Sequence, residues 1–525
     1  MLREHLRGLI EAGKTAEALD QVMSLLKRTS HKLAALELKL LGARGARSEA
    51  VSSDQLALFM GLLQQTLGDA PTPAEGTPPA PPAAEPKDKK PKPAPHGRGK
   101  LPDHLPRHDI IVPVTGEDCV CVHCNREKDI IGYDDSEELE LEPARLFVKR
   151  HRHEKRACKH CHADAVTAPA TPRVIAGGLP GPALLTDVLN GKFDFNMPLE
   201  RQSRRYGQMG HAIPPSTLGN WVAAGTALVE PLSRRFFELI MKAKVMQADG
   251  TGLKVLDRDH PDGVRVGAIW VYVAPELPLV HFRFINDKQK DGPVSLLKDR
   301  DGYVVVDADQ KLNPLFAWPH SKAIESGCNM HGRRYFQKAL VAGDLRATHA
   351  IKLYKEVYKV EREAREKQLD HDAIKALRQE KSKPLMQQLG EWARNGALVE
   401  DPKSALGKAF GYMVRQFIPL TRFLEDGRLP IDNGASERAI RNLAVGRRAW
   451  LFTGSDLGAE RTAIAYSITG SCRLSNLNTT AYWQDALSKL AAGWPTSRLD
   501  ELLPHNWAKA HPEHVRVQPK EPDLA

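Results

Sequence analysis

A proline- and alanine-rich stretch places the firmest limit on how this chain can fold. Between Gly68 and Pro102 the sequence reads GDAPTPAEGTPPAPPAAEPKDKKPKPAPHGRGKLP, with no large apolar residue before Leu101. Such a segment cannot bury enough apolar surface to offset the entropy lost on folding. We therefore predict a semi-extended linker over residues 68–102.

The residues ahead of the linker have a helical pattern. Apolar residues recur at spacings of three and four over residues 1–67, as in LREHLRGLIEAG and KLAALELKLL. The pattern predicts a helical hairpin or short coiled coil, which serves either in dimerisation or as a plain packing unit. The N-terminus lacks signal-peptide features and the chain has no apolar run of about 18 residues, so we expect a cytoplasmic protein without a membrane span.

Two cysteine pairs follow the linker. Cys121 and Cys124 form one C-x2-C pair, and Cys158 and Cys161 form another. Together they supply the four sulfur ligands that zinc prefers. We predict a zinc-ribbon-like DNA-binding domain over residues 103–170; the alternative is two turns with reduced thiols, with nearby histidines as substitute ligands or phosphate contacts. The odd total of seven cysteines argues against a disulfide framework.

Positive charge is gathered in blocks. The formal net charge is +10, and the basic blocks read KDKKPKPAPHGRGK, VKRHRHEKRACKH and SERAIRNLAVGRR. Clustered Lys and Arg are typical of nucleic-acid binding, although solvated surface gives the same pattern. Residues 171–240 have helical patterns divided by turns, which indicates either a helix-turn-helix-like region or ordinary helical packing.

Three acidic residues lie where a sheet can bring acids together. Asp249 stands inside an apolar strand pattern, KVMQADGTGLKVLD, where an unpaired carboxylate is costly to bury. Two strand patterns and a helical stretch follow, then GYVVVDAD, with Asp307 at the end of its apolar run. Glu437 opens a helix in SERAIRNLAVGRR. The alternation predicts an α/β sheet on which these acids can converge on two magnesium ions; otherwise they are caps or salt-bridge members.

Longer segments carry a specific resemblance to a known family. They read SGCNMHGRRYFQKAL, LYKEVYKVEREARE and IDNGASERAIRNLAVGRRAWLFTGSDLGAERTAIAYSI, with LPHNWAKAHP near the C-terminus. On these segments the chain resembles transposases of the insertion sequence 66 family, of the DDE class with a ribonuclease-H-like core. The resemblance implies an α/β fold with a catalytic core over residues 241–465, a helical insertion at about 350–403 and a helical tail over residues 466–525.

The resemblance also implies roles for the acids. Asp249, Asp307 and Glu437 take the places of the three catalytic acids, which hold Mg²⁺ or Mn²⁺ during DNA cleavage and strand transfer. The cysteine pairs correspond to the zinc-binding part of the family.

Two positions depart from the family pattern. Gly250 stands where an acidic residue usually follows the first acid, and Ala308 stands where glycine usually follows the second. The second motif here continues as Ala-Asp-Gln, so the choice between Asp307 and Asp309 stays open; we prefer Asp307 because it directly follows the apolar run.

The implied function is that of a DNA transposase that binds the terminal inverted repeats of a mobile element. Its partners would be the double-stranded DNA of element ends and target, further copies of the chain in a homo-oligomer, and accessory proteins of the same element. Cys328 and His331 alone offer too few ligands for a metal site, so we assign the histidine to DNA. Competing interpretations are a catalytically inactive DNA-binding remnant and a helical scaffold. The predicted DNA-binding residues are His331, Arg333, Arg334, Arg438, Arg441, Arg447 and Arg448.

Overall fold

The computed structural model describes residues 144–156, 166–175, 177–286, 292–317 and 321–516, with isolated positions nearer the N-terminus. The predicted N-terminal segment and linker lie, apart from such positions, outside the described residues. The four cysteines of the two predicted pairs lie outside them as well. The chain forms two compact units, Ala70–Val148 and the remainder, and the helices and strands from Lys155 onward belong to the second.

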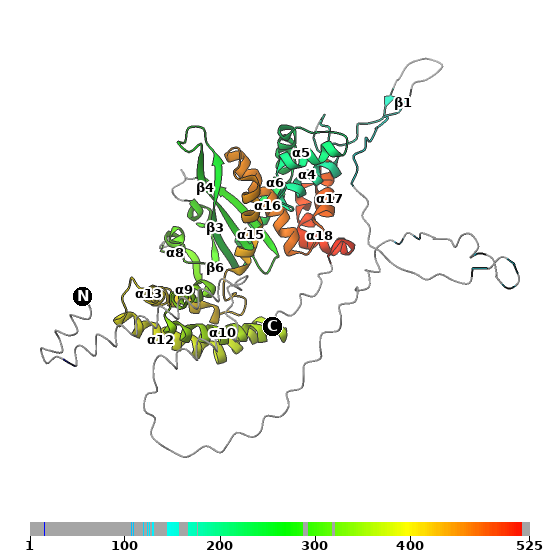
Figure 1. Ribbon diagram of the computed structural model, residues 1–525. Coiled ribbons are helices and arrows are strands. Elements are labelled where there is room, and N and C mark those ends of the chain that lie inside the picture. Colours follow the sequence, from blue (N-terminus) through cyan, green and yellow to red (C-terminus); the bar gives the residue numbers. More distant parts are fainter. Residues whose placement is uncertain are drawn as a thin grey trace. The chain divides into compact units, whose positions relative to one another are not determined.

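A five-stranded mixed sheet forms the centre of the larger unit, in the order β5-β4-β3-β6-β7 (Figure 1). Strands β3, β4 and β5 pair antiparallel as the predicted meander, and β6 and β7 then run parallel to β3. The predicted α/β class is confirmed. The strands are β3 (Val245–Leu256), β4 (Val264–Ala274), β5 (Leu279–Ile285), β6 (Asp301–Val306) and β7 (Lys322–Gly327).

Helices from both ends of the larger unit cover the meander. Helix α6 (Pro215–Lys242) and helix α16 (Asp456–Leu474) both pack on β5. The backbone N–H groups of Val280 and Phe282, on this edge strand, donate to the hydroxyls of Ser471 and Ser467 on α16. Since exposed strand edges invite pairing with other chains, α16 protects the sheet. This helix begins ahead of the predicted tail and belongs to the sheet layer.

Smaller helices extend this layer. The region predicted to be helical between residues 171 and 240 forms α4 and α5 ahead of α6, and α17 packs against α4 and α6. A short antiparallel ladder, β1 with β2, pairs Lys155 with Thr167. The bounds are β1 (Lys155–Arg156), β2 (Val166–Thr167), α4 (Pro182–Phe193), α5 (Leu199–Gln208), α7 (Gly292–Leu297), α8 (Asn313–Ala317), α17 (Thr479–Ala491) and α18 (Pro504–Ala510).

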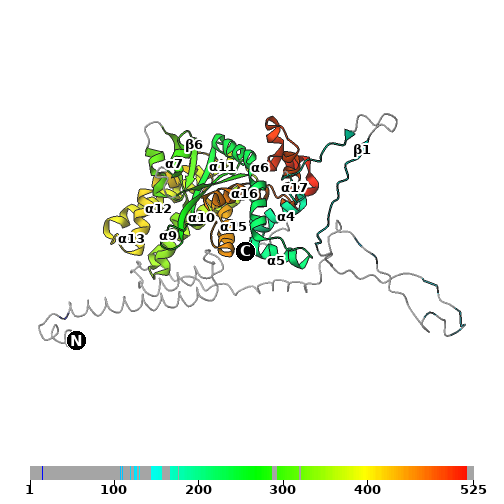
Figure 2. The ribbon, with the colours of Figure 1, turned by 90° about the horizontal axis from the view of Figure 1, so that it is seen from above.

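A separate group of helices follows β7, and Figures 1 and 2 show it on the side of the sheet away from α4 and α17. Its apolar core includes Phe336, Tyr354, Leu389 and Phe410, all buried, and is continuous with Val245 of β3 and Val305 of β6. The helices continue on both sides of the predicted insertion, so this helical unit extends from Asn329 to Leu424. They are α9 (Asn329–Val341), α10 (Thr348–Glu366), α11 (His371–Leu377), α12 (Lys383–Val399), α13 (Ala405–Arg415) and α14 (Phe417–Thr421).

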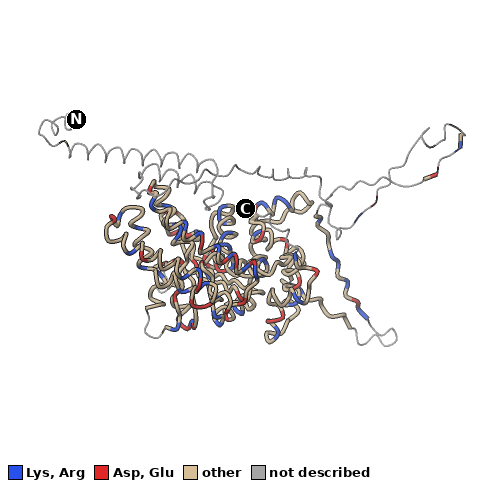
Figure 3. The backbone as a smooth tube through the Cα atoms, turned by 90° about the horizontal axis from the view of Figure 1, so that it is seen from below, with Lys and Arg blue, Asp and Glu red and all other residues tan. Residues whose placement is uncertain are grey.

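Helix α15 (Gly434–Trp450) returns the chain from the helical unit to the sheet, where it packs on β3 and β4. In the view of Figure 3, basic and acidic positions are interspersed along the backbone of the larger unit. Among the described residues, no helix is both long and apolar enough to cross a membrane.

Candidate active site

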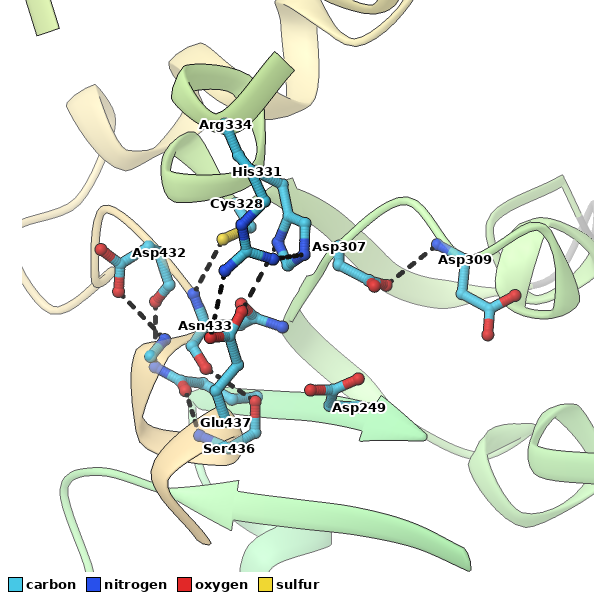
Figure 4. Close-up of polar contacts among 12 residues, drawn as sticks. Asp249, Asp307, Asp309, Cys328, His331, Arg334, Asp432, Asn433, Ser436 and Glu437 are labelled. Atoms are coloured by element: carbon cyan, nitrogen blue, oxygen red, sulfur yellow. Dashed lines mark hydrogen bonds and ion pairs between the residues drawn. The ribbon is translucent and has the colours of Figure 1, made fainter. Parts of the chain in front are cut away.

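The strand register places Asp249 beside Asp307. Strands β3 and β6 are parallel, and their last paired residues are Gln247 and Val305. Each aspartate lies two residues beyond this pair, and residues two apart in an extended chain share a face of the sheet. Both carboxylates are therefore at the carboxyl end of β6, where Figure 4 shows them close to Glu437.

Glu437 reaches the same place from the first turn of α15. The side-chain amide of Gln247, which is buried in β3, sets the position of this turn. Its Nε2 donates to the carbonyl of Asp432 over 3.2 Å, and its Oε1 accepts from the backbone N–H of Ser436 over 3.0 Å. Because Gln247 is two residues from Asp249, one strand positions both the first and the third acid.

The helical unit holds the other side of the same turn. Asn329, at the start of α9, donates through Nδ2 to the carbonyls of Ile431 (3.1 Å) and Leu420 (2.8 Å). The hydroxyl of Tyr358, on α10, donates to Oδ2 of Asp432 over 2.8 Å. The segment before Glu437 is thus fixed between the sheet and the helical unit.

Negative charge accumulates at this end of the sheet. The pKa of Asp249 is raised to about 7, first by burial and then by the nearby charges of Asp307, Glu437 and Asp309; a hydrogen bond from the N–H of Gly250 opposes this. Oε1 of Glu437 is buried and accepts no hydrogen bond within the described residues. An all-carboxylate donor set with raised proton affinity suits a hard divalent cation such as Mg²⁺.

His331 and Arg334, which the sequence assigned to DNA, face Glu437 (Figure 4). Nη1 of Arg334 lies 3.0 Å from Nε2 of His331, and a guanidinium can only donate. The proton of a neutral ring is therefore on Nδ1, which lies 3.7 Å from Oε1 of Glu437. Nη2 of Arg334 lies 3.9 Å from Oε2 of the same carboxylate. Neither contact is short enough for a hydrogen bond, but the guanidinium of Arg334 lies close enough to balance part of the charge of Glu437.

Cys328 joins His331 and Glu437 in a group whose possible ligand atoms all lie within 4.8 Å of one another. Burial raises the pKa of the Cys328 thiol to about 12, which disfavours the thiolate that a zinc site needs. Coordination through Nδ1 of His331 would also remove the last ring proton while Arg334 donates to Nε2. This group therefore suits zinc poorly, and the all-oxygen cluster is the better cation site.

The remaining predicted DNA contacts differ in exposure. Arg438, Arg441 and Arg448 are exposed on α15. Nη1 of Arg447 instead donates to the hydroxyl of Thr251 (2.8 Å) and to the carbonyl of the next residue (2.5 Å), which ties α15 to β3.

Arg333 lies over the ring of Tyr358, with 5.8 Å between the guanidinium carbon and the ring centroid.

The two residues that depart from the family pattern, Gly250 and Ala308, differ in what surrounds them. Gly250 pairs across the sheet with Trp270, and a Cβ at this glycine would lie 3.0 Å from the indole ring, so the tryptophan leaves little room for an acidic side chain. Ala308 has a φ of 66°, in the left-handed region that favours glycine. The Ala308 backbone is therefore strained in the loop that presents Asp307.

Sequence reasoning missed the residues that position the acids. Gln247 was detectable as a polar residue in an apolar strand run, at the spacing that puts it on the same face as Asp249. Asn329 and Tyr358 gave no such signal, because their partners are more than 70 residues away in the chain.

Comparison with protein families identifies the chain. The family described as Transposase IS66 family matches residues 177–461, more than half of the 525 residues. The chain belongs to this family. The resemblance inferred from the sequence is thereby confirmed.

Families that describe other parts of IS66 transposases match further segments of the chain. The zinc-finger binding domain of transposase IS66 matches residues 118–162, which include both predicted cysteine pairs. The IS66 C-terminal element matches residues 467–505, and a family described as Transposase C of IS166 homeodomain matches residues 43–110.

Relatives of this IS66 transposase occur in Sinorhizobium fredii (strain NBRC 101917 / NGR234). Uncharacterized protein y4hP is 32% identical over 441 residues, which is 79% of this chain and 77% of the relative. Uncharacterized protein y4jD is 31% identical over 425 residues, 78% of this chain and 82% of the relative. No solved structure matches the chain.

Proposed function

We propose that this IS66 transposase binds the terminal inverted repeats of its element and catalyses metal-dependent DNA cleavage and strand transfer with Asp249, Asp307 and Glu437. The observation that carries the proposal is that three acids, distant in sequence, lie close together at one end of the sheet. Burial first, and then the charges of the neighbouring acids, raise the pKa of Asp249 to about 7 there. Such a cluster is unfavourable without cations, and a fold retains it where cations belong.

The strand order supports a ribonuclease-H-like core for this proposal. An antiparallel meander followed by two strands parallel to its first strand, in the order β5-β4-β3-β6-β7, gives that arrangement. Asp307 is preferred to Asp309 as the second acid because it lies in register with Asp249. Oδ1 of Asp309 instead accepts from the N–H of Lys311, capping a short helix.

Each acid would hold Mg²⁺ or Mn²⁺ through carboxylate oxygens. When bound, a pair of such ions activates an attacking oxygen and stabilises the leaving oxygen in phosphoryl transfer. Gln247 would keep Glu437 beside Asp249 by holding the turn that precedes it, while the charge of Arg334 would offset part of the charge of the Glu437 carboxylate. The acids thus stay close together despite their mutual repulsion.

DNA recognition is assigned to other parts of the chain. The region that matches the zinc-finger binding domain would hold Zn²⁺ through Cys121, Cys124, Cys158 and Cys161 and read the element ends. The exposed arginines of α15 would contact phosphates, which fix register without reading sequence. A homo-oligomer would bring two ends together, with accessory proteins of the element as further partners.

A strand-transfer assay tests this function. Purified protein is mixed with a duplex carrying the native element end and with Mg²⁺ or Mn²⁺, alongside Asp249→Asn and Glu437→Gln variants. We expect cleavage and joining by the wild type alone, with all three proteins retarding the duplex in a gel. Retardation without cleavage by the wild type would mean an inactive DNA-binding remnant, which the strained Ala308 and the missing acid at Gly250 favour.

Zinc content tests the cysteine assignment separately. We expect stoichiometric zinc in the wild type and its loss, together with loss of end-specific retardation, in Cys121→Ser. The Cys472→Ser variant is the matched control, because this buried cysteine lies on α16, apart from the predicted pairs. Equal zinc in Cys121→Ser and the wild type would contradict the assignment.

A further inference from the structure

A basic stripe leads along α15 away from the third acid. Arg441 and Arg448 follow Glu437 at spacings of four and eleven residues, which places all three on one face of the helix. Both arginines are exposed. Arg447, by contrast, is turned into β3 and does not belong to the stripe.

The stripe ends at an exposed apolar pair. Leu451 is 63% exposed and Phe452 is 42% exposed. Leu451 also has a φ of 66°, a conformation that L side chains other than Asn and Asp rarely adopt. A leucine in this conformation is strained, and exposing it gains no burial energy in return; such strain concentrates at functional sites.

The chain around the pair is fixed. The N–H of Leu451 donates to the carbonyl of Arg447 over 2.9 Å. Thr453 pairs with β3 on both sides: its N–H donates to the carbonyl of Lys254 over 2.9 Å, and its carbonyl accepts from the N–H of Leu256 over 2.8 Å. The two apolar side chains are therefore held out on an anchored turn.

The surroundings of the pair are both apolar and basic. Val266 is 59% exposed and is the cross-strand partner of Lys254, which is itself exposed beside the turn. A patch of apolar surface bounded by Lys254 and Arg448 matches a nucleobase flanked by phosphates. Arg441 and Arg448 lead along α15 from Glu437 to this patch, which favours DNA over a second copy of this chain as its occupant.

We propose that Leu451 and Phe452 form an apolar wedge that contacts unstacked nucleobases of DNA whose phosphates follow Arg441 and Arg448. The inference rests on the proposed function, because it assumes that DNA reaches Glu437. Helix rise puts Leu451 about 21 Å from Glu437 along α15. At about 3.4 Å per nucleotide, the contacted bases lie roughly six positions from the reacting phosphate.

Aromatic stacking and apolar insertion are both general ways of holding disrupted base steps. The strained leucine would separate the stack and the phenylalanine ring would cover the exposed base. Because the acids cluster at the other end of α15, the wedge would fix how far the duplex end extends past them.

Fluorescence of 2-aminopurine tests the wedge in the full-length protein. The probe is placed singly at positions two to twelve from the cleaved bond, on either strand and on both sides of that bond, in a duplex with the native element end. We expect fluorescence to rise on binding at positions near six and not at two or twelve. Phe452→Ala should abolish the rise and weaken binding roughly tenfold.

Two further variants separate the wedge from folding. Leu451→Gly relieves the strained conformation, so it should raise thermal stability while reducing the fluorescence rise. Ile418→Ala is the matched control, since this residue is 67% exposed but lies in the helical unit, and it should leave the rise unchanged.

The outcomes distinguish the wedge from the proposed function. Cleavage by the wild type without a fluorescence rise at any position would overturn the wedge and leave the function standing. A rise that depends on Phe452 without cleavage would support the wedge alone. Loss of self-association in Phe452→Ala, measured by analytical ultracentrifugation, with no change in fluorescence would show that a second copy of the chain covers this surface instead.

Discussion

Asp194 and Asp249 are both shielded aspartates, yet their surroundings are opposite. Asp194 follows α4 and is buried, with Arg473 Nε donating to Oδ1 and the hydroxyl of Thr479 donating to Oδ2, each over 2.7 Å. Asp249 has one described hydrogen bond, from the N–H of its neighbour Gly250, and its other charged neighbours are acids.

The difference is the one expected between a structural carboxylate and a carboxylate that binds a cation. A buried carboxylate normally finds enough donors to replace its lost hydration, as Asp194 does. Asp249 is surrounded by charges of its own sign, so its environment opposes ionisation instead of supporting it. This contrast indicates function more directly than the type of either residue, and it can be tested in solution.

The largest expected effect is on catalysis by the acid cluster. Asp249→Asn and Glu437→Gln should each lower the strand-transfer rate by about 1,000-fold or more, because each removes a carboxylate that holds the divalent cations. Thermal unfolding should show no loss of stability, since each substitution removes like-charge repulsion. If Asp249→Asn lost as much stability as Asp194→Asn, the two aspartates would not differ in the way proposed.

Substitution of Gln247 should have the next largest effect on strand transfer. Gln247→Leu removes both hydrogen bonds to the turn before Glu437, and loss of such supporting contacts typically costs 10- to 100-fold in metal affinity or activity. The Mn²⁺ concentration for half-maximal strand transfer should rise, with DNA affinity unchanged. Gln247→Glu, which keeps the acceptor for Ser436, should be intermediate. Gln484→Leu, an exposed position on α17, controls for the added leucine.

Asp194→Asn should instead destabilise the protein. It weakens two hydrogen bonds to a charged group, each worth about 1.5–3 kcal/mol, and Arg473 is partly exposed, so we expect a loss of about 2 kcal/mol. Urea denaturation measures it. The strand-transfer rate per folded molecule should stay at the wild-type level; a catalytic loss matching that of Asp249→Asn would contradict the assignment of Asp194 to structure.

The acid cluster should also give the protein an unusual pH dependence. The folded pKa of Asp249, about 7, lies above the usual 3.8, so the cation-free folded state holds a proton that the unfolded state releases. This group's contribution to stability is therefore greatest at low pH and falls as pH rises from about 4 to 7.

Thermal unfolding of the wild type and of Asp249→Asn at pH 5.5 and pH 8, without divalent cations, measures this dependence. The change in stability between the two pH values is compared for the two proteins. The wild type should lose more stability toward pH 8, and added Mg²⁺ should restore more there. Identical pH profiles for the two proteins would mean that the acids do not interact.

The smallest effect concerns the loop of the second acid. Ala308→Gly relieves a left-handed alanine and should stabilise the protein by about 1 kcal/mol, with strand transfer retained. Ala342→Gly is the matched control, because this alanine has a φ of −75° and glycine there should give no gain. Urea denaturation compares the two.

Much of this architecture follows from local sequence patterns. The apolar runs around Asp249 and before Asp307 predicted their strands, and the pattern after Ser436 predicted α15. Parallel pairing of β3 with β6 was not readable, because it depends on contacts between residues far apart in the chain. The preference for Asp307 over Asp309 as the second acid rests on this register and on the capping role of Asp309, neither of which the sequence shows.

The supporting side chains were harder to predict. His331 and Arg334 have the composition of a phosphate site, and composition cannot show that their nearest anion is Glu437. The extent of the helical unit was also hidden, since a buried helix such as α9 has the same apolar spacing whether it covers a sheet or other helices. The cysteine pairs, by contrast, needed only their spacing to suggest a zinc region.

The helical unit lies between Asp307 and Glu437 in the sequence, so it is translated after the first of these acids and before the second. A ribosome that has passed Asp307 must still synthesise all of α9 to α14 before Glu437 emerges, and α16 later still. Nascent chains and prematurely terminated products therefore carry the zinc-finger region without a complete acid cluster. On the proposed function, such fragments would occupy an element end without cutting it, so an interrupted gene would yield a competitor of its own full-length product.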